Sequence, residues 1–175
     1  MKCKSTVAAI LGAILIFALG ATRAAYAAPP ADACALLTQA QVNAVLAVSV
    51  GAGSHMPPTY LKTCTWSPAG GPTNLVKYLT LSLQSADGFE TAKNVASQMA
   101  TAMKEKKDKD ANQIASGSAG GIGDDAYYAS MGGGYTALMV KKGNVAFKVA
   151  IYGGLAMEKK KAMEKSLAQE VLAKL

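Results

Sequence analysis

The chain has 175 residues and a formal net charge of +7. Three of its cations, Lys2, Lys4 and Arg23, lie in the first 27 residues, so loss of that segment lowers the net charge by three, to +4. The remaining basic residues are all lysines, and without arginine the chain lacks the planar group that clamps phosphates and reads guanine. We therefore expect no nucleic-acid partner, and the length suits one domain.

The first residues have the pattern of a secretory signal peptide. Lys2 and Lys4 precede an apolar run over residues 7–19, and Ala25-Tyr26-Ala27 supplies small residues before a cleavage point. The run is too short to cross a membrane, which takes about 20 apolar residues. We predict a signal peptide at 1–27, export to the periplasm or outside the cell, and no membrane span in the mature chain.

The two cysteines that remain after export are Cys34 and Cys64, because Cys3 leaves with the signal peptide. Thiols oxidise in exported compartments. The wide separation of the two lacks the Cys-x-x-Cys spacing typical of redox and metal pairs. We predict a structural disulfide, which stabilises the fold by roughly 3.5 kcal/mol through the loop that it closes.

The first half of the mature chain is expected to hold two helices and two strands. Residues 28–33 suggest a disordered leader, followed by a single domain over 34–175. Thr38 and Gln41 form a capping box for a first helix, and a loop containing Pro57-Pro58 separates it from strands over 61–67 and 75–84. A long amphipathic helix then begins near residue 87.

The second half predicts three strands and a closing helix. A short strand spans 126–130, and strands over 135–142 and 145–152 form a hairpin across Gly143-Asn144. An amphipathic helix covers 156–173. The order αββαβββα favours an α+β fold, with an antiparallel sheet of about five strands and helices packed on one face.

Three short motifs carry a resemblance to a known family. They are Cys34-x-Leu36-Leu37-Thr38, Cys64-x-Trp66 and Gly121-Ile122-Gly123-Asp124, in that order. Together they resemble a family of small exported bacterial proteins and lipoproteins of unknown function. Asp32 departs from the small-residue box that lipid attachment to Cys34 would need. The resemblance implies an exported α+β domain and carries over no catalytic residue.

Few residues suggest chemistry. His55 is the only histidine, and it is expected to be exposed in a loop beside Met56; imidazole and thioether groups suit copper, but two adjacent ligands without a repeat are a weak pattern. Asp124 and Asp125 suit a turn better than an acid pair or a calcium site, because adjacent residues of an extended chain point to opposite faces. We predict no catalytic residue, no cofactor and no metal site.

The leading functional hypothesis is a non-enzymatic domain that binds a protein or cell-envelope partner. Tyrosine is common at interfaces, and the candidate partner surface comprises Tyr127, Tyr128, Tyr135 and Tyr152. The simpler alternative for each is a half-buried tyrosine of the sheet. A second hypothesis is a carrier of a small apolar ligand, in a gap lined by Met99, Met103 and the leucines of 75–84. The third is a hydrolytic enzyme that depends on His55 or Asp124.

Overall fold

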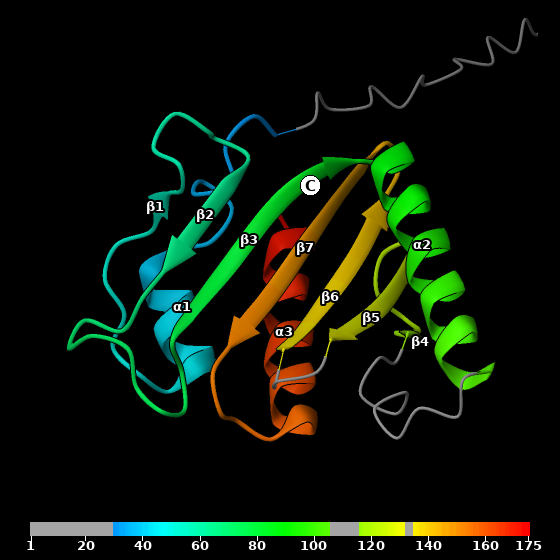
Figure 1. Ribbon diagram of the computed structural model, residues 1–175. Helices are drawn as coiled ribbons and strands as arrows, with labels where there is room; N and C mark the ends of the chain where they lie inside the picture. Colours follow the sequence, from blue (N-terminus) through cyan, green and yellow to red (C-terminus); the bar gives the residue numbers. More distant parts are fainter. Residues whose placement is uncertain (1–29, 106–115, 132–134) are drawn as a thin grey trace, which may run out of the picture.

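The computed structural model describes residues 30–105, 116–131 and 135–175 (Figure 1). The signal peptide predicted at 1–27 lies outside these residues. The described chain has the predicted α+β class, with one antiparallel sheet and three helices. In the described ranges, none of the helices combines the length and the apolar character that a membrane crossing requires.

The sheet has seven strands in the order β1-β2-β3-β7-β6-β5-β4. All five predicted strands are present: β2 (Thr63–Trp66), β3 (Tyr78–Ser85), β5 (Asp125–Met131), β6 (Tyr135–Lys142) and β7 (Val145–Tyr152). The predicted count was low because two short strands, β1 (Ser54–His55) and β4 (Ser116–Ser118), form the two edges. Strands of two or three residues are too short to show an alternating pattern.

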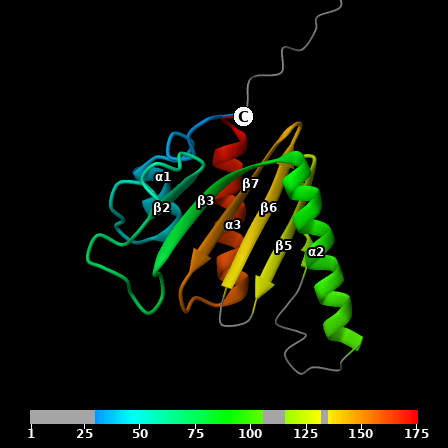
Figure 2. The same ribbon diagram turned by 45° about the horizontal axis from the view of Figure 1, so that its top comes forward.

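The helices cover both faces of the sheet, so the prediction that they pack on one face was wrong. Helices α1 (Gln39–Leu46) and α3 (Met157–Leu172) pack on the face that carries the leucines of β3. Helix α2 (Ala86–Glu105) lies on the other face, where Phe89 packs with Tyr127, Met139 and Ala146. Figures 1 and 2 show α2 in front of the sheet and α3 behind it. The cause is that β5, β6 and β7 have apolar side chains on both faces, and each face needs a cover.

The end of the predicted disordered leader is ordered. Ala33 is fully buried in the core, and its N–H donates to the carbonyl of Leu61 at 2.8 Å. The Cys34 N–H donates to the Asp32 carboxylate at 2.7 Å. Residues 30–33 are therefore part of the fold, and this section of the predicted leader is corrected, because packing and hydrogen bonds fix it next to the disulfide.

The predicted disulfide between Cys34 and Cys64 is present. It joins the segment before α1 to strand β2, and Cys64 and Trp66 of that strand are both buried. The capping box of α1 is present as well, since the Thr38 side chain accepts from Gln41 N–H and the Gln41 side chain accepts from Thr38 N–H. The bridge thus fastens the start of the domain to the sheet.

Gly53 packs directly against this bridge. A Cβ atom at Gly53 would lie 2.7 Å from Cys64 Sγ and 2.7 Å from Trp66 Nε1, and both side chains are buried. We expect Gly53→Ala to lower the free energy of unfolding by about 2 kcal/mol through overpacking. Gly70→Ala is the matched control, because nothing lies within 4 Å of its added methyl. Urea denaturation measures both, and equal losses would contradict the close approach at Gly53.

Candidate functional site

Two of the four predicted partner tyrosines do not belong to an exposed patch. Tyr127 and Tyr128 are consecutive on β5 and therefore point to opposite faces. Tyr127 is buried edge-on against Phe89 of α2, with ring centroids 5.2 Å apart. The hydroxyl of Tyr128 donates to the carbonyl of Lys161 of α3 at 3.1 Å. Tyr127 is buried, so its place in the predicted partner surface is corrected. Tyr128 is half-buried and holds α3 to the sheet.

Tyr135 and Tyr152 do lie together, and they are joined by Tyr78, which the sequence analysis did not select. Tyr78 of β3 pairs across the strands with Tyr152 of β7, and their rings stack at 4.2 Å. Tyr135, at the start of β6, has its ring 5.2 Å from that of Tyr152. The three tyrosines come from strands that are neighbours in the sheet, although β3 and β7 are far apart in the sequence.

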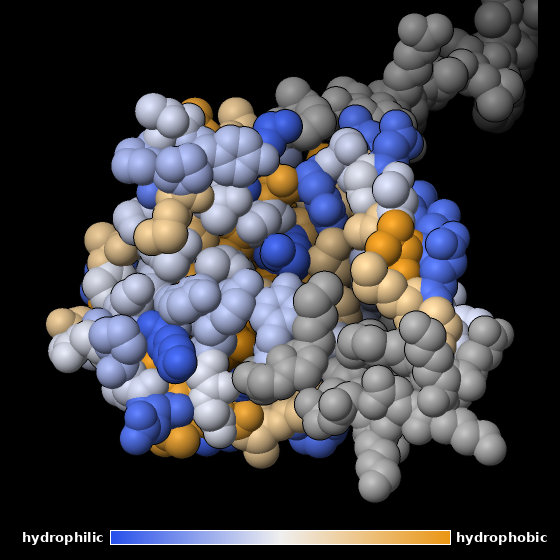
Figure 3. Space-filling model, in the orientation of Figure 1, coloured by the Kyte–Doolittle hydropathy of each residue, from blue (hydrophilic) through white to orange (hydrophobic). Residues whose placement is uncertain are grey.

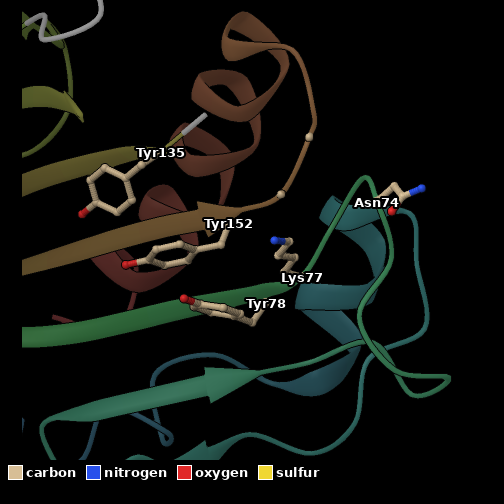
Figure 4. Close-up of a pocket in the computed structure, with 7 residues that line it drawn as sticks. Asn74, Lys77, Tyr78, Tyr135 and Tyr152 are labelled. Atoms are coloured by element: carbon tan, nitrogen blue, oxygen red, sulfur yellow. The ribbon is translucent and has the colours of Figure 1, made fainter. Parts of the chain in front are cut away.

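These tyrosines border a pocket of about 390 Å³ (Figure 4). The residues that line it are Asn74, Lys77, Tyr78, Tyr135, Tyr152, Gly153 and Gly154. In Figure 4 the hydroxyls of the three tyrosines point the same way along the sheet, and the Lys77 side chain lies beside Tyr152 and Tyr78. The pocket therefore combines aromatic rings, hydroxyls and one ammonium group.

Backbone contacts hold one wall of the pocket in place. The Lys77 N–H donates to the Tyr152 carbonyl at 2.7 Å, and the Gly154 N–H donates to the Asn74 carbonyl at 2.9 Å. Gly153 has a φ of 146°, and a Cβ there would lie 2.1 Å from the carbonyl oxygen of Leu75. Only glycine allows the two segments to approach so closely.

The polar lining of the pocket includes tyrosine hydroxyls and one lysine ammonium group. Burial raises the pKa of Tyr135 far above its usual value, and it also raises the pKa of Tyr152. Both residues therefore keep their protons at neutral pH. Within residues 30–105, 116–131 and 135–175, Lys77 forms no ion pair. Its positive charge is therefore not balanced by a described carboxylate.

A buried carboxyl group lies beneath these strands. Glu164 of α3 is fully buried, and its Oε1 accepts from Thr136 Oγ1 at 2.9 Å and from Ile151 N–H at 3.2 Å. Burial raises the pKa of Glu164 to about 7. Lys160, one turn earlier, is also buried and donates to the carbonyl of Gly153 at 2.6 Å.

Neither Lys160 nor Glu164 was among the residues that the sequence predicted to form a site. Lys160 and Glu164 continue the spacing of Leu167 and Val171 along α3, and all four are buried. That spacing was the available signal, since it places the two charges on the apolar stripe of the helix.

His55 is not an exposed loop residue, and this prediction is corrected. It lies on β1, directly opposite Cys64 in the register of β1 and β2. Its Nε2 is 2.8 Å from Asp32 Oδ1, and its side chain is partly buried. Met56 beside it is exposed. The short strand holds His55 against the disulfide, and the sequence did not indicate a strand in this loop.

Asp124 and Asp125 have separate structural partners. Asp124 accepts from the Gly143 N–H at 2.6 Å and from Lys142 at 3.1 Å, and these hydrogen bonds lower the pKa of its carboxyl group, with that of Gly143 contributing most. Asp125 pairs with Lys93 of α2 at 2.5 Å. Asp124 thus supports the turn between β6 and β7.

The fold and the site define an α+β domain with a tyrosine-lined pocket on one face of its sheet. Comparison of the chain with protein-family models, with curated proteins and with solved structures gives no match. The resemblance to exported bacterial proteins of unknown function therefore stays a prediction.

Proposed function

We propose that this protein is an exported, non-enzymatic binding domain, and that the tyrosine-lined pocket holds an acidic group of a cell-envelope partner. The observation that carries the proposal is the pocket of about 390 Å³ that Lys77 shares with Tyr78, Tyr135 and Tyr152. Its volume lies in the range of about 300–1,000 Å³ that is typical of ligand sites. The disulfide supports export, because such bridges persist in oxidising compartments.

The lining favours a carboxylate attached to a polar or partly apolar body. The ammonium group of Lys77 attracts an anion, and the tyrosine hydroxyls offer hydrogen bonds to neighbouring polar groups. The rings provide rigid contact area at a low cost in conformational entropy. Sugars and peptides that carry carboxyl groups combine these features, and both occur in cell-envelope polymers.

The arrangement of the helices gives no support to the apolar carrier. That hypothesis needs Met99 of α2 and the leucines of β3 to line one gap. Instead, Leu79 and Leu81 are fully buried on the face covered by α1 and α3, whereas α2 packs on the other face. Met99 is 48% exposed, and Figure 3 shows hydrophobic groups on the outer surface of α2. The side chain of Met103 lies outside the described residues.

The hydrolase hypothesis ranks third. Asp32 and His55 resemble the carboxylate and base of a catalytic triad. Among the described residues, however, no hydroxyl group forms a hydrogen bond with His55, and the neighbouring sulfurs are joined in the disulfide. A triad needs a nucleophile within hydrogen-bond reach of the base.

The binding proposal is tested by titrating the protein with soluble peptidoglycan fragments that carry free carboxyl groups, followed through the amide signals in NMR spectra. We expect shifts at Lys77, Tyr78, Gly153 and Gly154. Lys77→Gln and Tyr78→Ala should each weaken binding about tenfold, as loss of a central contact does. High salt should reduce the contribution of Lys77.

Tyr60→Ala is the matched control, because Tyr60 is an exposed tyrosine outside the pocket. It should leave the affinity unchanged. Circular dichroism checks that each variant is folded. Absence of binding, or equal affinity in Lys77→Gln, Tyr78→Ala and the unmodified protein, would count against the proposal.

A further inference from the structure

Four groups with metal-binding chemistry meet at the disulfide, away from the tyrosine-lined pocket. His55 lies across the strands from Cys64, and Cys64 is bonded to Cys34. The carboxylate of Asp32 is 2.8 Å from His55 Nε2 and accepts from the Cys34 N–H at 2.7 Å. Asp32, Cys34 and His55 each offer one ligand atom, and these three atoms lie within 4.8 Å of one another.

The cluster is accessible from solvent, and the Asp32 carboxylate lies in hydrogen-bond contact with the His55 ring. The side chains of His55 and Asp32 are 23% and 39% exposed, which leaves a path from solvent. Cys34 is partly buried and Cys64 is fully buried, so the sulfurs form the inner side of the cluster.

In the oxidised protein the two sulfurs are shared in one covalent bond and carry no thiolate charge. Only a carboxylate oxygen and an imidazole nitrogen then remain as good ligands. Reduction changes this, because thiolates are strong ligands for zinc and related metals.

We propose that reduction of the Cys34–Cys64 disulfide creates a zinc site whose ligands are Cys34, Cys64, His55 and Asp32. A dithiol reductant supplies two electrons: the S–S bond breaks, two thiols form, and the dithiol becomes a disulfide. Zinc(II) then displaces one proton from each thiol and binds the two thiolates, the neutral imidazole and the carboxylate. The disulfide and the zinc site are therefore alternative states of the same residues, and this inference does not depend on the proposed function of the pocket.

The geometry suits a tetrahedral ion. With bond lengths of about 2.0–2.3 Å, tetrahedral zinc holds its ligand atoms about 3.3–3.8 Å apart. The ligand atoms of Asp32, Cys34 and His55 already lie within 4.8 Å of one another. Cys64 Sγ is bonded to Cys34 Sγ, and the two sulfurs separate when the S–S bond breaks. Two sulfurs, one nitrogen and one oxygen favour zinc over calcium, which takes six or more oxygen ligands. The carboxylate favours zinc over copper(I), which prefers softer ligands.

The test uses the protein expressed from the full chain, reduced with a phosphine and titrated with cobalt(II), a spectroscopic substitute for zinc. We expect a thiolate-to-cobalt charge-transfer band and the visible bands of tetrahedral cobalt, both lost on addition of zinc. The oxidised protein should show neither. His55→Ala and Asp32→Asn should each lower the zinc affinity at least about tenfold, since even residues that only support metal ligands have effects of this size.

Met56→Ala is the matched control, because Met56 adjoins His55 but is 63% exposed and outside the cluster. It should bind zinc as the unmodified protein does. The near-ultraviolet circular dichroism of buried Trp66 reports whether the reduced, zinc-bound protein is folded. Zinc binding without the folded Trp66 signal, or undiminished affinity in His55→Ala and Asp32→Asn, would overturn the proposal, as would an absence of the tetrahedral cobalt spectrum.

Discussion

Replacement of both Cys34 and Cys64 by alanine should lower the free energy of unfolding by about 3.5 kcal/mol. The bridge closes a loop with a sequence separation of 30, and it acts mainly by restricting the unfolded chain. It also fixes Ala33 and Asp32 beside β2, where Ala33 is buried. The segment before α1 should therefore become the first part of the domain to lose protection from hydrogen exchange in the variant.

The measurement is urea denaturation of the oxidised protein and of the double alanine variant. Reduction of the unmodified protein, in the presence of a metal chelator, should give the same loss within error. That comparison separates removal of the covalent bond from replacement of the sulfur atoms. A loss below about 1 kcal/mol would contradict the role of the bridge, because it would fall far under the loop-closure value.

The free energy of unfolding of the unmodified protein should fall as the pH rises from about 4.5 to about 7. Glu164→Gln should remove most of this fall. Burial raises the pKa of Glu164 from 4.5 to about 7 in the folded protein. Between these values the folded state holds a proton that the unfolded state has lost, so a rise in pH favours unfolding. The shift corresponds to about 3 kcal/mol of stability. This stability is present at low pH, is lost progressively as the pH rises, and is absent above the pKa of Glu164 in the folded state.

The charged and titratable groups around Glu164 set the size of this effect. Lys160 and Lys161 of α3 attract its carboxylate and oppose the rise in its pKa. Tyr128 lies on the face of the sheet covered by α3, where its hydroxyl donates to the carbonyl of Lys161, and burial raises its pKa, so it stays protonated in this range. Denaturation curves from pH 4.5 to pH 8 measure the slope. Glu158→Gln is the matched control, because Glu158 lies on the same helix and is exposed. Its stability should depend on pH as steeply as that of the unmodified protein. A steep dependence in Glu164→Gln would contradict the assignment of this effect to Glu164.

Local patterns predicted most elements because each depends on neighbouring residues. The alternation in β3 and the Gly143-Asn144 connection between β6 and β7 were visible as period-two runs and a turn. The capping box of Thr38 and Gln41 placed the start of α1 correctly. The disulfide was predictable because only two of the three cysteines lie outside the predicted signal peptide.

The candidate sites were less predictable because they depend on which strands become neighbours. Tyr78 joins Tyr152 only through the pairing of β3 with β7, and the sequence carries no local mark of that pairing. His55 meets Asp32 and the disulfide through a strand of two residues. Glu164 was readable only as a polar position within an apolar stripe.

By itself the sequence determined the α+β class, the five longer strands and the pairing of Cys34 with Cys64, because hydrophobic period, turn residues and cysteine number are local or countable properties. The tertiary structure decided that α2 covers the opposite face from α1 and α3. It also decided that Tyr127 is buried while Tyr152 borders a pocket. The physical reason is that a strand pattern shows which side chains share a face, whereas the helix that covers this face depends on the apolar area left open by the whole sheet.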